Sequence, residues 1–119
     1  MYKRRNPLTY KQCTQTVTVY HKDGQTVTRQ VFDRAYMDFR KVQTIDKTGS
    51  KDASSFLLVI PTNTPVVFVG DKAIMGEGPE VPASEWAKFI PANVPGLVVV
   101  DAVDSKYYGM ELVHQEASG

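Results

Sequence analysis

The chain holds little of what catalytic and metal sites are commonly built from, since its 119 residues include one cysteine and two histidines. Cys13 alone cannot form an intramolecular disulfide, and a single thiol excludes a thiolate metal cluster. Long apolar runs are also missing, because the longest, at 56–61 and 97–100, are far shorter than the ~18 residues that a membrane-spanning helix needs. No apolar segment follows the charged residues 3–5, so a secretion signal is not expected. We therefore expect a soluble intracellular protein with no bound cofactor or metal.

An excess of charge of one sign is lacking as well. The 14 basic and 13 acidic residues leave a net charge of +1, so no global field would recruit nucleic acid or an anionic membrane surface. The exception is the N-terminus, where no acidic residue before Asp23 offsets Lys3, Arg4, Arg5 and Lys11. We predict a flexible basic arm over residues 1–13, solvated or in contact with phosphate, followed by a single domain over residues 14–119.

The clearest pattern present is a two-residue alternation between residues 14 and 32. Val17 and Val19 fall on one face of the first run, and a second run continues the pattern through Val31. Between the two runs lies Asp23-Gly24, a pair favoured in tight hairpin turns that need positive φ at both central residues. The pattern predicts a β-hairpin.

The rest of the domain reads as short strands and turns. Further strands are predicted at 35–42, 56–60, 66–69, 72–75, 97–103 and 107–115, with a turn at 104–106. One short helix is predicted near 84–90, where 82–85 offers a cap and Pro91 a stop. Residues 43–55 have no periodicity and predict a long polar loop, a feature that is usually functional or disordered. About eight short strands indicate a mostly β fold, a small single-domain barrel or sandwich.

A search for reactive groups gives no catalytic residue. The two imidazoles, His21 and His114, fall inside predicted strands, and a satisfied or surface histidine is the favoured interpretation of each. A zinc site would need both of them and a carboxylate such as Glu116, with no spacing motif in support. Residues 70–80 combine three glycines with three carboxylates, but turns around a buried strand explain them better than a calcium or phosphate loop.

One aromatic pair is a candidate for nucleic-acid contact. Tyr107 and Tyr108 follow Lys106, and an RNA-binding sheet exposes aromatic and basic residues together. Adjacent strand residues point to opposite faces, so only one of the two tyrosines could stack on a base. A structural role for the two tyrosines is therefore favoured over an RNA contact.

The order of segments resembles a family of small virion proteins of tailed bacteriophages, encoded among the head–tail joining genes of phages of Gram-positive bacteria. The likeness covers residues 16–119 and rests on six pieces in order: Thr16-Val17-Thr18-Val19-Tyr20-His21, Ile60-Pro61, Gly70-Asp71 with Gly76-Glu77, Val103-Asp104, Tyr108-Gly109, and His114-Gln115-Glu116-Ala117-Ser118-Gly119. The sequence departs from the family at His21, where asparagine is frequent, and at Gln115, where an aromatic is frequent.

The resemblance implies a head–tail connector of the head-closure or stopper type, located in the virion and assembled in the cytoplasm of the bacterial host. Its partners would be further copies of itself in a six- or twelve-fold ring, a portal or adaptor protein, tail proteins and, if the ring lines the channel, packaged DNA. It implies no enzyme activity, no membrane contact and no small-molecule substrate.

The segments expected to order on assembly are the polar loop and the basic arm, because alone they bury too little to offset their conformational entropy. The candidate interface residues are Thr48, Gly49, Ser50, Lys51 and Asp52 in the loop, with Arg4 and Arg5 in the arm. Two alternatives stay open. One is another phage structural role, such as tail completion or a minor capsid protein, and the other is a non-phage β-barrel binding module or small enzyme.

Overall fold

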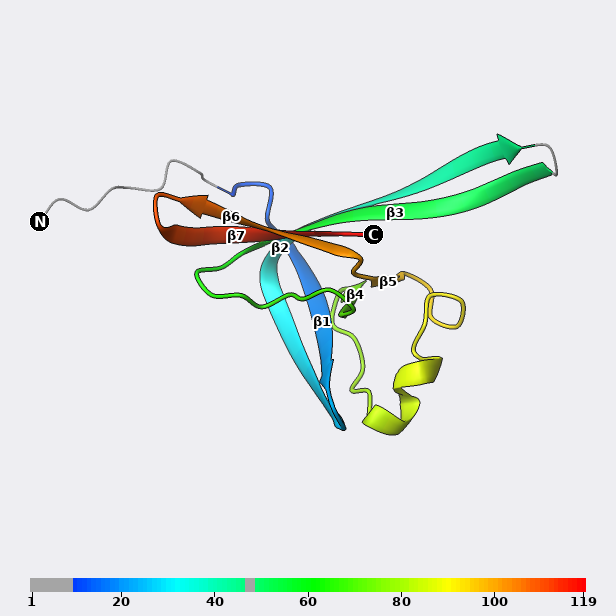
Figure 1. Cartoon of the computed structure of the whole chain (residues 1–119), viewed down its shortest axis with the longest axis horizontal. Helices are drawn as coiled ribbons and strands as arrows, with labels where there is room; N and C mark the ends of the chain where they lie inside the picture. Colours follow the sequence, from blue (N-terminus) through cyan, green and yellow to red (C-terminus); the bar gives the residue numbers. More distant parts are fainter. Residues whose placement is uncertain (1–9, 47–48) are drawn as a thin grey trace, which may run out of the picture.

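The computed structural model describes the backbone of residues 10–46 and 49–119, and the side chains of residues 10–39 and 55–119 (Figure 1). The described chain forms one antiparallel sheet of seven strands, curved into a half-barrel, in the order β5-β4-β1-β2-β3-β7-β6. The strands are β1 (Gln15–Asp23), β2 (Thr26–Asp46), β3 (Gly49–Pro61), β4 (Lys72–Met75), β5 (Leu97–Val99), β6 (Ala102–Tyr108) and β7 (Glu111–Ser118). The prediction of a mostly β single-domain fold is confirmed.

Several predicted boundaries are wrong in ways that have physical reasons. The strand predicted at 35–42 is the continuation of β2 rather than a separate element. The strand predicted at 66–69 is irregular, because the backbone amides of Val66 and Val67 donate to the Gln115 side chain instead of to a neighbouring strand. The turn predicted at 104–106 lies inside β6, an edge strand, where polar residues are tolerated because one side faces water.

The hairpin between β1 and β2 is present, with its turn one residue later than predicted. Asp23 pairs with Thr26, so the two central residues are Gly24 and Gln25. Only Gly24 has positive φ, at 61°, as in turns that carry glycine at the first central position. Val17 and Val19 are both buried in the barrel, as the alternation predicts.

The long strand β2 changes partner in its middle. Residues up to Ala35 pair with β1, and residues from Tyr36 onwards pair with β3. At the change, the backbone amide of Met37 donates to the Gln15 side-chain oxygen over 2.7 Å, which satisfies a donor that β1 no longer meets. The β2–β3 hairpin then runs away from the body as a two-stranded ribbon (Figure 1).

This ribbon overturns the predicted loop at 43–55. Its backbone is paired from Arg40 with Ser55 to Asp46 with Gly49. In the sequence, polar residues occupy both odd and even positions of this stretch, so the alternation that marks a half-buried strand is missing. We call residues 40–55 the arm, and Phe39 with Phe56 its base.

The two outer edges of the sheet are joined by one short crossing. β5 ends at Val99 on one edge and β6 begins at Ala102 on the other. Val100 donates to the Asp71 backbone oxygen and accepts from the Gly70 amide, both over 2.8 Å, while the amide of Asp101 donates to Ser118. The crossing therefore holds β4 and β7 together and closes the half-barrel.

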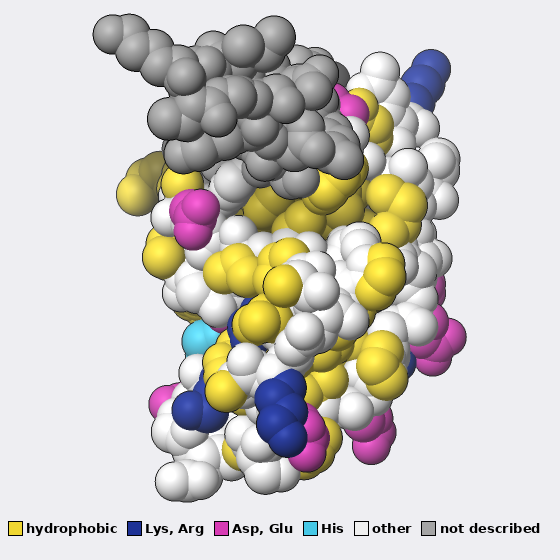
Figure 2. Space-filling model, turned by 90° about the vertical axis from the view of Figure 1, so that its right-hand side faces the viewer, with side chains coloured by type: hydrophobic (Ala, Val, Ile, Leu, Met, Phe, Trp, Pro, Cys, Tyr) yellow, Lys and Arg dark blue, Asp and Glu magenta, His cyan; other side chains and the backbone are white. Residues whose placement is uncertain are grey.

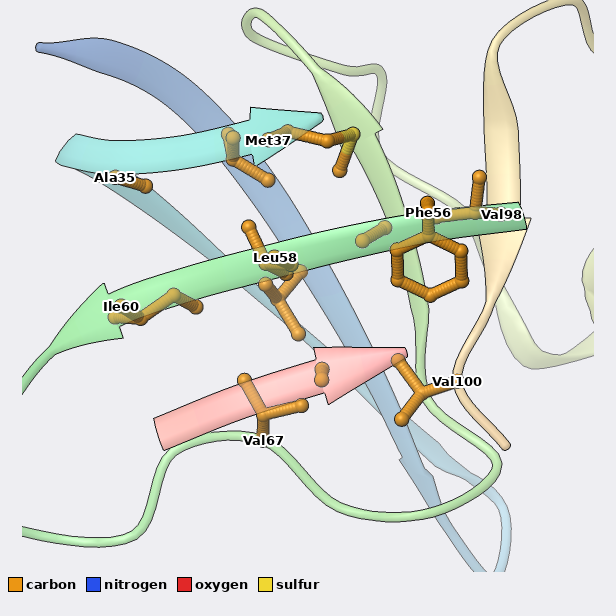
Figure 3. Close-up of a cluster of buried hydrophobic side chains, with 12 residues drawn as sticks. Ala35, Met37, Phe56, Leu58, Ile60, Val67, Val98 and Val100 are labelled. Atoms are coloured by element: carbon orange, nitrogen blue, oxygen red, sulfur yellow. The ribbon is translucent and has the colours of Figure 1, made fainter. Parts of the chain in front are cut away.

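The main core fills this half-barrel (Figure 3). It gathers side chains from β1 to β5, from β7, from the irregular strap around Val67 and from the crossing at Val100. Leu58 and Ile60 of β3 are fully buried. Gln115, also buried, accepts the amides of Val66 and Val67, and its amide nitrogen donates to the Val67 oxygen over 3.3 Å. One side chain thus secures the strap over the core.

The opposite face of β1 is covered as well. Tyr20 is fully buried there and packs edge-to-face on Phe89, with ring centroids 4.8 Å apart. Its hydroxyl donates to the Pro79 oxygen over 2.6 Å, and Arg29 donates twice to the Gly78 oxygen. A Cβ on Gly78 would lie 2.1 Å from the Tyr20 hydroxyl, so this close approach requires glycine. The loop after β4 is thereby fixed against β1.

The predicted helix near 84–90 is a 3₁₀ helix, η1 (Ala83–Lys88). It ends where the amide of Phe89 bonds the backbone oxygens of Glu85 and Trp86, and no side chain caps its start. Lys72 is buried beneath it, with its ammonium 4.1 Å from the centre of the Trp86 ring and bonded to the Trp86 oxygen. Burial lowers the pKa of this lysine. Among the described residues no helix has the length and apolar character of a bilayer crossing.

Candidate functional site: an assembly interface

The predicted interface residues fall in two places. Gly49, Ser50, Lys51 and Asp52 are the first residues of β3, at the far end of the arm, in a paired strand and not in the predicted loop. Thr48, Arg4 and Arg5 lie outside the described residues. Residues 10–13, the described part of the predicted basic N-terminal segment 1–13, contact the body. Cys13 is buried there, and burial raises the pKa of its thiol.

The arm has one pairing partner on each strand. In the described chain, β2 beyond Ala35 pairs only with β3, and β3 before Leu57 pairs only with β2 apart from one bond from the Phe56 amide to Gly119. Each arm strand therefore presents an outer edge of backbone donors and acceptors. A long exposed edge is a template for pairing with another chain. A two-stranded ribbon is marginally stable in water, so the arm would gain most from a partner.

An apolar groove lies at the base of the arm. It has a volume of about 290 Å³ and is bounded by the base of the arm, by β5 and by the segment before it. The lining residues are Phe39, Phe56, Pro91, Gly96, Leu97, Val98, Val99, Asp101 and Gly119. Phe39 is 47% exposed although it lies opposite the buried Phe56. Figure 2 looks onto the arm side of the molecule and shows hydrophobic side chains gathered there.

His21 is held by an acidic partner. Its Nδ1 lies 2.6 Å from the Oδ1 of Asp71, a carboxylate that is 2% exposed. The other carboxylate oxygen accepts the backbone amide of Phe68 over 2.9 Å. The pair therefore ties β1 to the turn before β4, next to the crossing at Val100.

His114 is bonded on both ring nitrogens. Nδ1 lies 2.8 Å from the Tyr10 hydroxyl and Nε2 lies 2.9 Å from Glu116. The Tyr10 side chain packs edge-to-face on the imidazole, which brings the N-terminal segment onto the outer face of β7. A cavity of about 410 Å³ remains between this segment, Tyr36 and Val59. The described residues include no group of three His, Cys, Asp or Glu side chains that could hold a metal ion.

Lys106 is engaged within its own strand. Its ammonium lies 2.7 Å from the Asp104 carboxylate, and this hydrogen bond raises the pKa of the lysine. Tyr107 beside it is 61% exposed. The lysine that an RNA contact at Tyr107 and Tyr108 would use is thus already bonded to a carboxylate.

Sequence reasoning missed the groove. Its signal was present as two phenylalanines, Phe39 and Phe56, that enclose a polar stretch, but their pairing depends on the strand register of the hairpin. In comparisons with known proteins, no family model, no curated protein and no solved structure matches this chain. The likeness to phage head–tail joining proteins rests on the residues quoted in the sequence.

Proposed function

We propose that the chain is a structural subunit of a tailed-bacteriophage virion, a head–tail connector of the head-closure type that assembles as a ring. The observation that carries the proposal is the arm, a long two-stranded ribbon whose backbone runs out from the body (Figure 1). Monomeric proteins usually shorten, cover or twist away such edges. An arm that keeps both edges open is best explained by a neighbour that covers them.

The groove at the base of the arm adds a second surface on the same side. Repeated contact between different surfaces of identical subunits generates a ring when the rotation closes. The ring would lie between a portal or adaptor and the tail, with six or twelve copies as the sequence resemblance implies. The histidine pairs described above act structurally in this proposal, holding segments of one subunit together.

The test compares the full chain with a chain whose arm is shortened symmetrically. Deleting residues 42–45 and 50–53 together removes four complete cross-strand pairs, keeps the connection at 46–49 and preserves the alternation of faces. Analytical ultracentrifugation and negative-stain electron microscopy should show closed rings for the full chain and monomers for the shortened chain. A full chain that stays monomeric at high concentration would contradict the proposal.

The position in the virion is tested separately. Particles made with the shortened chain should have DNA-filled heads that leak or lack tails, and a map of intact particles should place the ring at the portal vertex. Density on the capsid surface or at the tail tip would favour another structural role. Absence of the protein from purified particles would favour the non-phage binding module.

A further inference from the structure

The turn between β6 and β7 carries the most exposed apolar side chain of the described residues. Met110 is 100% exposed, next to Gly109, which has a φ of 65° and forms the turn. Tyr107, at the end of β6, is 61% exposed. Single exposed apolar residues are common, but here two large ones occupy the end of one hairpin. We call residues 107–110 the tip.

The tip and the groove lie on opposite sides of the body. In Figure 1 the β6–β7 hairpin points to the left, whereas β5 and the arm lie to the right, and Figure 2 shows the right-hand side. The two surfaces of one copy therefore cannot meet each other. A second copy that is displaced along the long axis presents its tip to the groove of the first, beneath the arm.

The groove has room for what the tip carries. A cavity of ~150 Å³ accepts a benzene molecule, so a groove of about 290 Å³ can take the methionine side chain together with part of a tyrosine ring. The tip and the groove both present large apolar side chains, and each also has an acidic residue, Glu111 beside the tip and Asp101 in the lining of the groove. Burial of the apolar side chains is therefore the attraction available, and charge pairing between these two carboxylates is not.

We infer that the tip of one copy docks in the groove at the base of the arm of the next copy, as a head-to-tail contact. The inference deepens the proposed function and rests on it. A stable interface buries roughly 800 Å² per partner, more than a hairpin tip supplies. The arm, which extends over the neighbour from the same side, provides the remaining contact. In this arrangement the tip–groove contact sets the direction of assembly, and the arm adds to the area buried in the interface.

Cysteine cross-linking tests the contact directly. In a Cys13→Ala background, a Met110→Cys chain is mixed with an Asp101→Cys chain and treated with a short bis-maleimide. The expected product is a dimer that contains one chain of each kind. Two controls fix the geometry: Met110→Cys alone should give no dimer, and Gln25→Cys, at the exposed turn of another hairpin, should not join to Asp101→Cys. A Met110–Met110 dimer would show a two-fold contact and overturn the inference.

A charge variant gives an independent readout. Met110→Lys should raise the concentration for half-assembly by at least about tenfold, because a residue at the centre of an interface costs this much or more when its contact is lost. Gln25→Lys should leave assembly unchanged, and both variants should melt like the parent chain. Rings that form normally with Met110→Lys would overturn the inference and leave the proposed function standing. Open filaments joined by the tip–groove cross-link would support the inference and count against the closed ring.

Discussion

The two halves of β3 belong to one strand and have opposite environments. Residues 57–61 pair with β7, and residues 57–59 also pair with β2 on the other side. This half carries Leu58 and Ile60 into the core, where neither side chain has exposed surface. Residues 49–55 pair with β2 alone and lie in the arm. Residues 57–61 stabilise the fold through burial, whereas residues 49–55 have a single pairing partner in the described chain. The same strand thus passes from the core of the body into a ribbon with an unpaired outer edge (Figure 1).

The largest effect on stability should come from the inner half of β3. Leu58→Ala should cost about 2–5 kcal/mol, since it removes a fully buried side chain and leaves a cavity. Thermal unfolding followed by circular dichroism should show a decrease in Tm of roughly 10 °C or more. Leu57→Ala is the matched control, because this neighbour is 38% exposed and should cost below ~1 kcal/mol. Equal losses from the two variants would contradict the division between faces.

The next effect concerns the strap that Gln115 holds over the core. Gln115→Leu keeps an apolar side chain of similar size but leaves the amides of Val66 and Val67 without their acceptor. The expected cost is about 1–3 kcal/mol in the free energy of unfolding, measured by urea titration. Gln30→Leu, at an exposed position on β2, should change it by under ~0.5 kcal/mol. A Gln115→Leu chain as stable as the parent would mean that water or another acceptor replaces the side-chain oxygen of Gln115.

A smaller effect is expected at the β1–β2 turn, far from the arm. Gly24→Val should cost about 1–2 kcal/mol, because a side chain at this positive φ is strained even though the space around it is open. Gln25→Val, at the other central position, where φ is not positive, should cost less. Differential scanning calorimetry of both variants measures the difference. A larger loss from Gln25→Val would show that the turn has a different conformation.

The smallest effect on stability should follow the largest change in length. The chain without residues 42–45 and 50–53 should still melt cooperatively, within a few degrees of the full chain, because the removed pairs lie in the ribbon that runs out from the body (Figure 1). Changing the length of a surface hairpin also alters the closure entropy only slightly. Loss of the cooperative transition would show that the body depends on the arm, and the contrast between the halves of β3 would fail.

The alternation of buried residues was sufficient to predict the body. Val17 and Val19, the turn near Gly24 and the apolar run at 56–60 gave the fold class and most strands. The arm was missed because its sequence carries no two-residue hydrophobic period, the pattern that marks a strand with one buried face. The irregular strap at 66–69 was missed because its backbone bonds go to the Gln115 side chain, almost fifty residues later in the sequence.

The candidate interface was less predictable than the fold. The sequence drew attention to Gly49–Asp52 through their polar composition, and the structure puts them at the end of a paired ribbon. The groove depends on the register that brings Phe39 opposite Phe56 and on the position of β5, neither of which has a local signal. The sequence predicts a single strand over 107–115, whereas the structure places Met110 in the turn between β6 and β7. Its interest comes from full exposure at one end of the molecule.

The crossing at Val100 and Asp101 has a consequence for the order of folding during synthesis. The residues that close the half-barrel, 97–118, are synthesised well after their partners Gly70 and Asp71. A nascent chain can form the β1–β2 and β2–β3 hairpins locally, but its core is enclosed only after residues 97–118 have been made. Pairings this distant in sequence slow folding, since loop closure precedes the gain from contact. The outer edges of the β2–β3 hairpin are therefore present before the body is complete, and two nascent chains that meet at this stage would pair through unfinished sheets.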